Sequence, residues 1–172
     1  MIPFVSIIGR GNTGKTTLIR SLIRKLGLLG YSVAVIKHDP HDHGDVDRKG
    51  SDTWAFKEAG SKAVILASPS RLTVFRETEQ EQFPEDFSRL CGDVDLIILE
   101  GYKKRDYPKI FVWTGKKDLD VQPHWDLLAI VYPREEAEEV LGHFGETTIP
   151  LFCRDDTLNI ARFLERRFIK KR

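Results

Sequence analysis

The sequence predicts an α/β fold of three layers, built on a mostly parallel sheet. The first observation behind this prediction is that short apolar runs of strand length alternate along the chain with helical stretches. The second is the segment GRGNTGKTT at Gly9–Thr17, which joins the first apolar run directly to the first helical stretch. Ligands of such sheets bind at the carboxyl ends of the strands, so this segment also marks where a functional site is expected.

Five apolar runs are expected to form the strands of the parallel sheet. The run Val94–Gly101 is apolar almost throughout, which is typical of a strand covered on both faces. The other four are Phe4–Ile8, Ser32–Lys37, Lys109–Trp113 and Leu127–Tyr132. Two further runs, Lys62–Ala67 and Arg71–Glu77, flank the turn residues SPS and predict a hairpin or a tight bend, the antiparallel addition to this fold.

The stretches between these strands, and after the last of them, predict five helices. The first, Thr17–Leu29, places five apolar side chains on one face, namely Leu18, Ile19, Leu22, Ile23 and Leu26. The second, Ser51–Gly60, is expected to be capped by Ser51 or Asp52 and to stop at Gly60. The remaining helices are expected at Pro84–Cys91, Arg134–Phe144 and Asp155–Phe168.

The composition predicts one globular domain over residues 1–172, with 41% hydrophobic and 31% charged residues. A net charge of +1 gives no overall attraction to nucleic acid or to a membrane, and the basic end RRFIKKR is better explained as a solvated helix end. Cys91 and Cys153 lie in apolar surroundings, so two core thiols are favoured over a disulfide or a zinc site. With no signal peptide and no membrane-spanning run, the chain is expected in the cytoplasm.

The segment at Gly9–Thr17 matches the phosphate-loop pattern G-x-x-x-x-G-K-[ST], with Gly9, Gly14, Lys15 and Thr16 at its fixed positions. Such a loop turns backbone N–H groups inward around a phosphate, and the following helix presents its N-terminus to the same anion. Lys15 is expected to neutralise the outer phosphates and to assist catalysis, and the Thr16 hydroxyl to bind Mg²⁺. The fold class is therefore refined to a P-loop NTPase fold. The other expected nucleotide-binding residues of the loop are Arg10, Gly11, Asn12, Thr13 and Thr17. A glycine-rich turn that merely joins strand to helix is the alternative.

A phosphate loop needs a second carboxylate near its Mg²⁺, supplied from the end of a neighbouring strand. Glu100 stands at such an end, in LIILEG, and is expected to be a metal ligand and a catalytic residue. The usual residue is Asp, and because Glu is one methylene longer it is expected to hold the metal through water or to position the attacking water. Gly101 would let the backbone approach a γ-phosphate. The alternative is a surface carboxylate.

The segment KHDPHDHGDVDRKGSD at Lys37–Asp52 contains three histidines and five aspartates. A polar loop that faces the triphosphate is favoured, followed by a solvated loop and then by a transition-metal site, because no structural zinc spacing is present. The residues expected to face the site are Lys37, His38, His41, Asp47 and Asp52.

Two further features concern the nucleotide. In TGKKD, Lys116 and Asp118 match part of the guanine-binding pattern [NT]-K-x-D, but Gly115 replaces the first residue, so a turn explains the segment better. Arg10 occupies the loop position at which one class of ATPases places a lysine that reaches the partner's nucleotide across a dimer. Two explanations of Arg10 therefore stay open: it contacts the nucleotide of the partner, or it is a surface arginine near the phosphate.

Four segments together resemble the MobB family of molybdopterin-guanine dinucleotide biosynthesis adaptor proteins, and the resemblance covers most of residues 1–110. They are GRGNTGKTTL, VIKHDPHD, DRKGSDTWAFKEAG and DLIILEGYK. The resemblance implies a dimeric, GTP-binding P-loop protein with weak GTP hydrolysis, which assists the guanylyltransferase MobA in joining GMP to molybdopterin. By position it implies phosphate and Mg²⁺ ligands at Gly14, Lys15 and Thr16, and pocket residues at Lys37, His38, His41, Asp47, Asp52, Glu100 and Lys103.

The alternative function is that of a small P-loop kinase acting on a metabolite. A kinase is expected to carry an arginine-rich lid, whereas the segment RETEQEQFPED at Arg76–Asp86 is mostly acidic. A homodimer is expected from the resemblance and from the commonness of two-fold dimers. Phe111, Trp113 and Trp125 add a second argument, since large aromatic side chains that a small chain cannot hide are typical of interfaces.

Overall fold

The chain folds into two compact units in a computed structural model that describes residues 2–41, 47–115, 122 and 124–169. The larger unit comprises residues 1–38 and 88–172, and the smaller one residues 39–87. Each unit is described by itself below, and the single domain expected over the whole chain stays a prediction. Among the described residues, no helix is long and apolar enough to cross a membrane.

The larger unit is built on a six-stranded parallel sheet with the strand order β2-β5-β1-β6-β7-β8. Its strands are β1 (Phe4–Ile8), β2 (Val33–Lys37), β5 (Leu96–Glu100), β6 (Lys109–Val112), β7 (Leu127–Tyr132) and β8 (Leu151–Cys153). Because all neighbours are parallel, the carboxyl ends of β1, β2, β5 and β8 lie along one edge of the sheet. This confirms the predicted α/β class and brings segments far apart in sequence to that edge.

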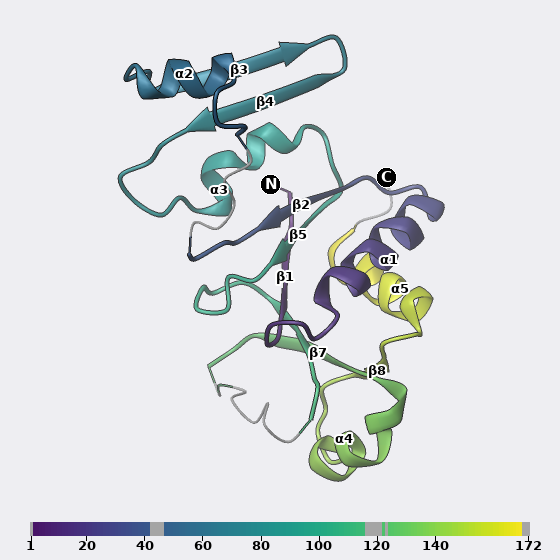
Figure 1. Cartoon of the computed structure of the whole chain (residues 1–172). Helices are drawn as coiled ribbons and strands as arrows, with labels where there is room; N and C mark the ends of the chain where they lie inside the picture. Colours follow the sequence, from purple (N-terminus) through teal and green to yellow (C-terminus); the bar gives the residue numbers. More distant parts are fainter. Residues whose placement is uncertain (1, 42–46, 116–121, 123, 170–172) are drawn as a thin grey trace. The chain divides into compact units, whose positions relative to one another are not determined.

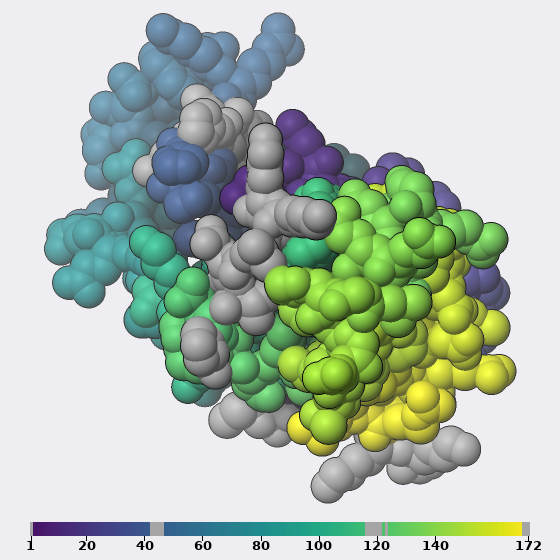
Figure 2. Space-filling model, turned by 90° about the horizontal axis from the view of Figure 1, so that it is seen from below, coloured from purple at the N-terminus to yellow at the C-terminus, as the bar shows by residue number. Residues whose placement is uncertain are grey.

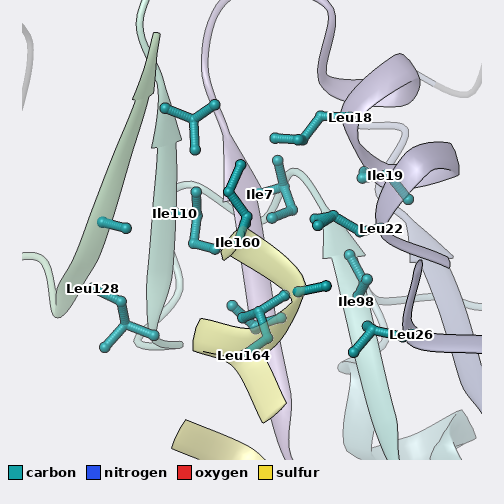
Figure 3. Packing of buried hydrophobic residues seen from close by; sticks show 14 of the residues in the cluster. Ile7, Leu18, Ile19, Leu22, Leu26, Ile98, Ile110, Leu128, Ile160 and Leu164 are labelled. Atoms are coloured by element: carbon teal, nitrogen blue, oxygen red, sulfur yellow. The ribbon is translucent and has the colours of Figure 1, made fainter. Parts of the chain in front are cut away.

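Both faces of this sheet are covered, which gives the expected three layers. Helices α1 (Lys15–Leu28) and α5 (Thr157–Phe168) pack on one face, where Leu22, Ile98 and Ile160 meet in a fully buried cluster (Figure 3). On the opposite face lies α4 (Ala137–Phe144), whose Val140 belongs to a second buried cluster; residues around α4 are light green in Figure 2. Neighbouring strand residues alternate between the two layers, as a pleated strand requires; Ile7 belongs to the first cluster and Ile8 to the second.

The smaller unit consists of a short helix and an antiparallel hairpin (Figure 1). Helix α2 (Asp52–Glu58) is capped by Ser51, whose hydroxyl accepts a hydrogen bond from the Trp54 N–H over 3.2 Å. Strands β3 (Ala63–Ser68) and β4 (Arg71–Arg76) pair as the sequence predicts. The short helix α3 (Pro84–Phe87) follows at the boundary and continues into a 3-10 turn at Ser88–Cys91.

Three features differ from the sequence predictions. The strand β8 was not expected, because a three-residue run shows no periodicity of its own. Helix α1 begins at Lys15 rather than at Thr17, since Gly14 in the left-handed conformation already serves as its N-cap. The helix expected from Arg134 starts as a 3-10 turn at Arg134–Glu136 and becomes α-helical only at Ala137.

The aromatic argument for a dimer is wrong. Phe111, Trp113 and Trp125 are 4%, 0% and 9% exposed, and they pack together inside the larger unit. Their rings contact one another and, in the case of Trp113, the ring of Phe144 on α4. The sheet and α4 therefore bury all three aromatic side chains, and these side chains are not available for contact with a partner.

Candidate functional site

The phosphate loop leaves the end of β1 with a backbone that only glycine can supply at two points. A Cβ on Gly9 would lie 2.7 Å from the Val112 carbonyl oxygen on β6, so a side chain there would collide with the neighbouring strand. Gly14 has φ +83°, a left-handed conformation that lets it end the loop and cap α1 at once. The first and last glycines of the motif are thus required for the turn itself.

The N-terminus of α1 opens onto this loop. The first helical hydrogen bond runs from the Leu18 N–H to the Gly14 carbonyl, so the N–H groups of Lys15, Thr16 and Thr17 precede the helical ladder. The first turn contains no acidic residue, which leaves the positive end of the helix dipole uncompensated by its own side chains. An anion at this point would be bound by backbone and dipole together.

Lys15 lies over the loop that precedes it. Its ammonium group donates to the Arg10 carbonyl oxygen and lies 3.5 Å from the Thr13 hydroxyl. Thr13 is buried and donates in turn to the Arg10 carbonyl over 3.0 Å, which closes the loop on itself. Gly11 and Asn12 form its exposed tip. The ammonium therefore already lies beside the loop that would surround a phosphate.

Glu100 at the end of β5 lies next to α1. The Thr16 hydroxyl donates a hydrogen bond to Glu100 Oε1 over 2.9 Å, across 84 residues of sequence. A hydroxyl and a carboxylate are the oxygen ligands that Mg²⁺ prefers, and adjacent ligands of an octahedron with bonds of about 2.1 Å are about 3 Å apart. The spacing of the two residues is therefore compatible with a shared Mg²⁺, and their role as metal ligands stays a prediction. Among the described residues, no three or more His, Cys, Asp and Glu side chains are grouped so that they could hold a metal ion, so phosphates and water would complete the ligand set.

Residues at the end of β2 border Glu100. Lys37 is opposite Glu100 in the strand register, and the His38 N–H donates to the Glu100 carbonyl over 3.0 Å. The His38 ring stacks on Tyr102 with ring centres 4.5 Å apart. The Gly101 N–H donates to the Ile7 carbonyl over 3.1 Å and is therefore already used within the sheet. Gly101 could still help a phosphate to bind, because its lack of a side chain lets the phosphate approach its Cα closely.

Lys103, which was expected in the nucleotide pocket, lies over an aromatic ring. Its ammonium group is 5.2 Å from the centre of the Trp125 ring, within the range of a cation–π contact. Nothing in this contact prevents the exposed lysine from turning toward a ligand. Its role in the pocket stays a prediction.

Two basic residues of the larger unit were not singled out in the sequence. Lys109 is 1% exposed and donates from its ammonium to the carbonyls of Arg105 and Tyr107, which holds the connection between β5 and β6. Burial lowers the pKa of Lys109, while the neighbouring carboxylates Asp106 and Asp126 raise it in part. The other is Arg154, directly after β8, whose side chain lies against Gly14. For Lys109, the only sign in the sequence was a lysine at the start of an apolar strand. For Arg154, the sequence held no sign of its position.

Three expected pocket residues belong to the smaller unit. Asp47 is buried there, accepts hydrogen bonds from Ser51 and Thr53, and pairs with the Lys57 ammonium over 3.0 Å. His41 donates its backbone N–H to the Asp39 carboxylate, and Asp52 is the exposed first residue of α2. Their expected role at the nucleotide stays a prediction. Lys116 and Asp118, the partial guanine-binding pattern, lie outside the described residues.

Burial raises the pKa of Asp47, but hydrogen bonds from Lys57, Thr53 and Ser51 outweigh it. The net result is a pKa below the ordinary value of an aspartate. Asp47 is thus held ionised just before α2. It contacts both the cap residue Ser51 and Lys57 in the last turn of that helix, and so links the two ends of α2. In the smaller unit this carboxylate has a structural function of its own.

Comparison with known proteins agrees with the sequence resemblance. The family model of MobB, molybdopterin guanine dinucleotide synthesis protein B, matches residues 4–132. The molybdopterin-guanine dinucleotide biosynthesis adapter protein of Haemophilus influenzae is 39% identical over 115 residues, which cover 64% of this chain and 63% of that protein. A Bacillus subtilis protein, named as a probable adapter of the same biosynthesis, is 31% identical over 163 residues, 92% of this chain and 89% of its own length.

Solved structures show the same fold over nearly the whole chain. A crystal structure of Bacillus subtilis MobB superimposes with a TM-score of 0.75 at 26% identity, covering 99% of this chain and 100% of that one. A structure of molybdopterin-guanine biosynthesis protein B gives 0.70 at 27% identity and covers 95% and 98%. The family model matches most of the chain, and the matched residues include the phosphate loop and Glu100. The chain therefore belongs to the MobB family.

Proposed function

We propose that the chain is an adapter protein of molybdopterin guanine dinucleotide biosynthesis that binds GTP together with Mg²⁺ at its phosphate loop. The observation that carries the nucleotide part is the hydrogen bond between Thr16 and Glu100, which brings two magnesium-type oxygen ligands to the open N-terminus of α1. The names of the relatives support the pathway.

In this proposal each part of the loop has a separate task. The N–H groups at the start of α1 bind phosphate oxygens, and the Lys15 ammonium moves from the Arg10 carbonyl to the outer phosphates. Thr16 and Glu100 hold Mg²⁺, directly or through water, and the ion supplies charge neutralisation to the phosphate chain when bound. Glu100 is also the group that would orient an attacking water, and hydrolysis is at most weak.

The proposed partner is the MobA-type guanylyltransferase that joins GMP to molybdopterin, and the chain is proposed to act as a cytoplasmic homodimer. Support for the partner comes from the adapter role in the names of the relatives. Support for the dimer comes from the family resemblance, because the buried aromatic residues no longer contribute.

The direct test is the melting temperature of the purified chain with GTP, GDP and ATP, each with Mg²⁺ and with a chelator. A ligand at a hundred times its Kd stabilises a fold by about 2.7 kcal/mol, so specific binding is easily seen. Stabilisation by GTP above ATP, and more with Mg²⁺, supports the proposal. A pull-down with the purified guanylyltransferase, with and without GTP, tests the adapter role. ATP selectivity with turnover of small acceptors would instead support a kinase.

A further inference from the structure

Arg154 is held at the edge of the sheet from which the phosphate loop emerges. It follows β8 directly, and its backbone N–H donates to the Tyr132 carbonyl over 2.7 Å, which extends the ladder between β7 and β8 by one residue. Because β8 is parallel to β1, its carboxyl end lies on the same edge as the end of β1. The backbone of Arg154 is thus positioned by the sheet and not by a loose loop.

The side chain of Arg154 extends across the last glycine of the phosphate loop. A Cβ placed on Gly14 would lie 3.1 Å from Arg154 Nη1, 3.7 Å from its Cδ and 3.8 Å from its Cζ. Gly14 is the N-cap of α1, next to the N–H groups that open toward an anion. The guanidinium therefore lies beside the last glycine of the loop, next to the proposed phosphate site.

The guanidinium has no counter-ion in the described part of the chain. Its side chain makes no hydrogen bond and no ion pair with any described residue. The acidic residues that follow it do not pair with it, and Asp156 instead accepts a hydrogen bond from Asn159. Arg154 is half-buried, so its charge is partly removed from water without a compensating partner.

The surroundings of Arg154 are positive as well. The N-terminus of α1 carries the positive end of the helix dipole, its first turn lacks an acidic residue, and Lys15 adds a full charge. A third positive group at this place is unfavourable in the empty protein and becomes favourable once a polyanion binds. An arginine with a purely structural role would instead be expected beside groups that stabilise its charge in the protein without ligand.

We propose that Arg154 is a nucleotide-binding residue whose guanidinium donates hydrogen bonds to phosphate oxygens of the nucleotide at the loop. The inference rests on the proposed function, since it assigns a further residue to the same site. Arginine suits this task because its planar group can donate two parallel hydrogen bonds to one phosphate. The absence of a side chain at Gly14 leaves room for the guanidinium beside the loop.

The test compares the wild-type chain with Arg154→Gln, Arg154→Lys and the control Arg162→Gln, which changes an exposed arginine on α5. Calorimetry measures binding of Mg²⁺–GTP and of inorganic tripolyphosphate, a probe that has phosphates but no base or ribose. For Arg154→Gln we expect about 10- to 100-fold weaker binding of both ligands, as is typical for loss of a charged hydrogen bond. Arg154→Lys should recover part of this loss, and Arg162→Gln should bind as the wild type does.

The melting temperature without ligand separates a binding role from a structural one. Because the empty site holds uncompensated positive charge, we expect Arg154→Gln to melt no lower than the wild type. A clear fall in that temperature, with no recovery of affinity in Arg154→Lys, would make Arg154 a structural residue and overturn the inference. Weaker GTP binding with unchanged tripolyphosphate binding would also overturn it, because the contact would then be to base or ribose.

The outcome for the proposed function is read separately. If the wild-type chain binds GTP and Arg154→Gln binds it equally well, the inference is wrong and the proposed function stands. If the wild-type chain binds neither GTP nor tripolyphosphate, the proposed function fails, and the assignment of Arg154 fails with it.

Discussion

Glu100 Oε1 accepts a hydrogen bond from the Thr16 hydroxyl over 2.9 Å, and this contact joins the end of β5 to the start of α1. Glu100→Gln preserves the length of the side chain and can still accept that hydrogen bond, but it removes the negative charge. We expect the variant to keep its stability and to lose most of the increase in GTP affinity that Mg²⁺ provides, together with any hydrolysis.

The measurement is GTP affinity with Mg²⁺ and with a chelator, alongside thermal unfolding. Glu146→Gln is the matched control, since Glu146 is exposed and lies beyond α4. Equal Mg²⁺ dependence and equal turnover in Glu100→Gln and in the wild type would reduce Glu100 to a surface carboxylate.

Lys15→Ala is expected to abolish binding of GTP while the chain stays folded. The ammonium donates to the Arg10 carbonyl and lies near the Thr13 hydroxyl in its own loop, and the loss of one such hydrogen bond typically costs about 1 kcal/mol of folding stability. Calorimetry measures the affinity and circular dichroism the fold. Lys25→Ala, in the last turn of the same helix, controls for the general loss of charge. Unchanged GTP affinity in Lys15→Ala would refute the assignment of the phosphate loop.

The sequence was a good guide wherever a local pattern determines the structure. The phosphate loop is recognisable because its glycines are required locally, by the approach of Val112 to Gly9 and by the left-handed Gly14. Glu100 could be expected beside it because parallel strands end at a common edge. The hairpin of β3 and β4 follows from two apolar runs around a turn.

Other features depend on contacts between distant segments, for which the sequence carries no local signal. Trp113 looked like an interface residue until β6 and α4 were seen to enclose it. Lys109 is buried because two carbonyl groups of the preceding connection accept its hydrogen bonds. Arg154 reaches Gly14 only through the pairing of β8, a strand too short to predict.

The smaller unit should lose stability in acid because of Asp47. The pKa of this carboxyl is lowered in the folded chain, so its contribution is complete above the ordinary aspartate pKa of about 3.9 and disappears as the pH falls through the lower folded value. Asp47→Asn should remove this dependence and should loosen α2 at every pH above that range, because the pair with Lys57 is lost.

Amide hydrogen exchange of residues 51–76, followed from pH 6 to about pH 3 with correction for the intrinsic rate, measures this local stability. Asp52→Asn is the control, since Asp52 is exposed and lies on the same short helix. Equal protection in Asp47→Asn and Asp52→Asn, at every pH, would show that the Asp47 contacts do not hold this unit together.

The last prediction concerns assembly. We expect a homodimer, now on the family resemblance alone, because Phe111, Trp113 and Trp125 are buried within the larger unit. Sedimentation at several protein concentrations, with and without GTP, measures it, and a monomer throughout would refute it. If Arg10 contacts the nucleotide of the partner, Arg10→Ala should weaken dimerisation by up to about tenfold with GTP and little without it, because the contact exists only when the phosphates are bound. Arg20→Ala, an exposed arginine on α1, is the control. A dimer that responds neither to GTP nor to Arg10→Ala would leave the assembly in place and remove Arg10 from the partner's site.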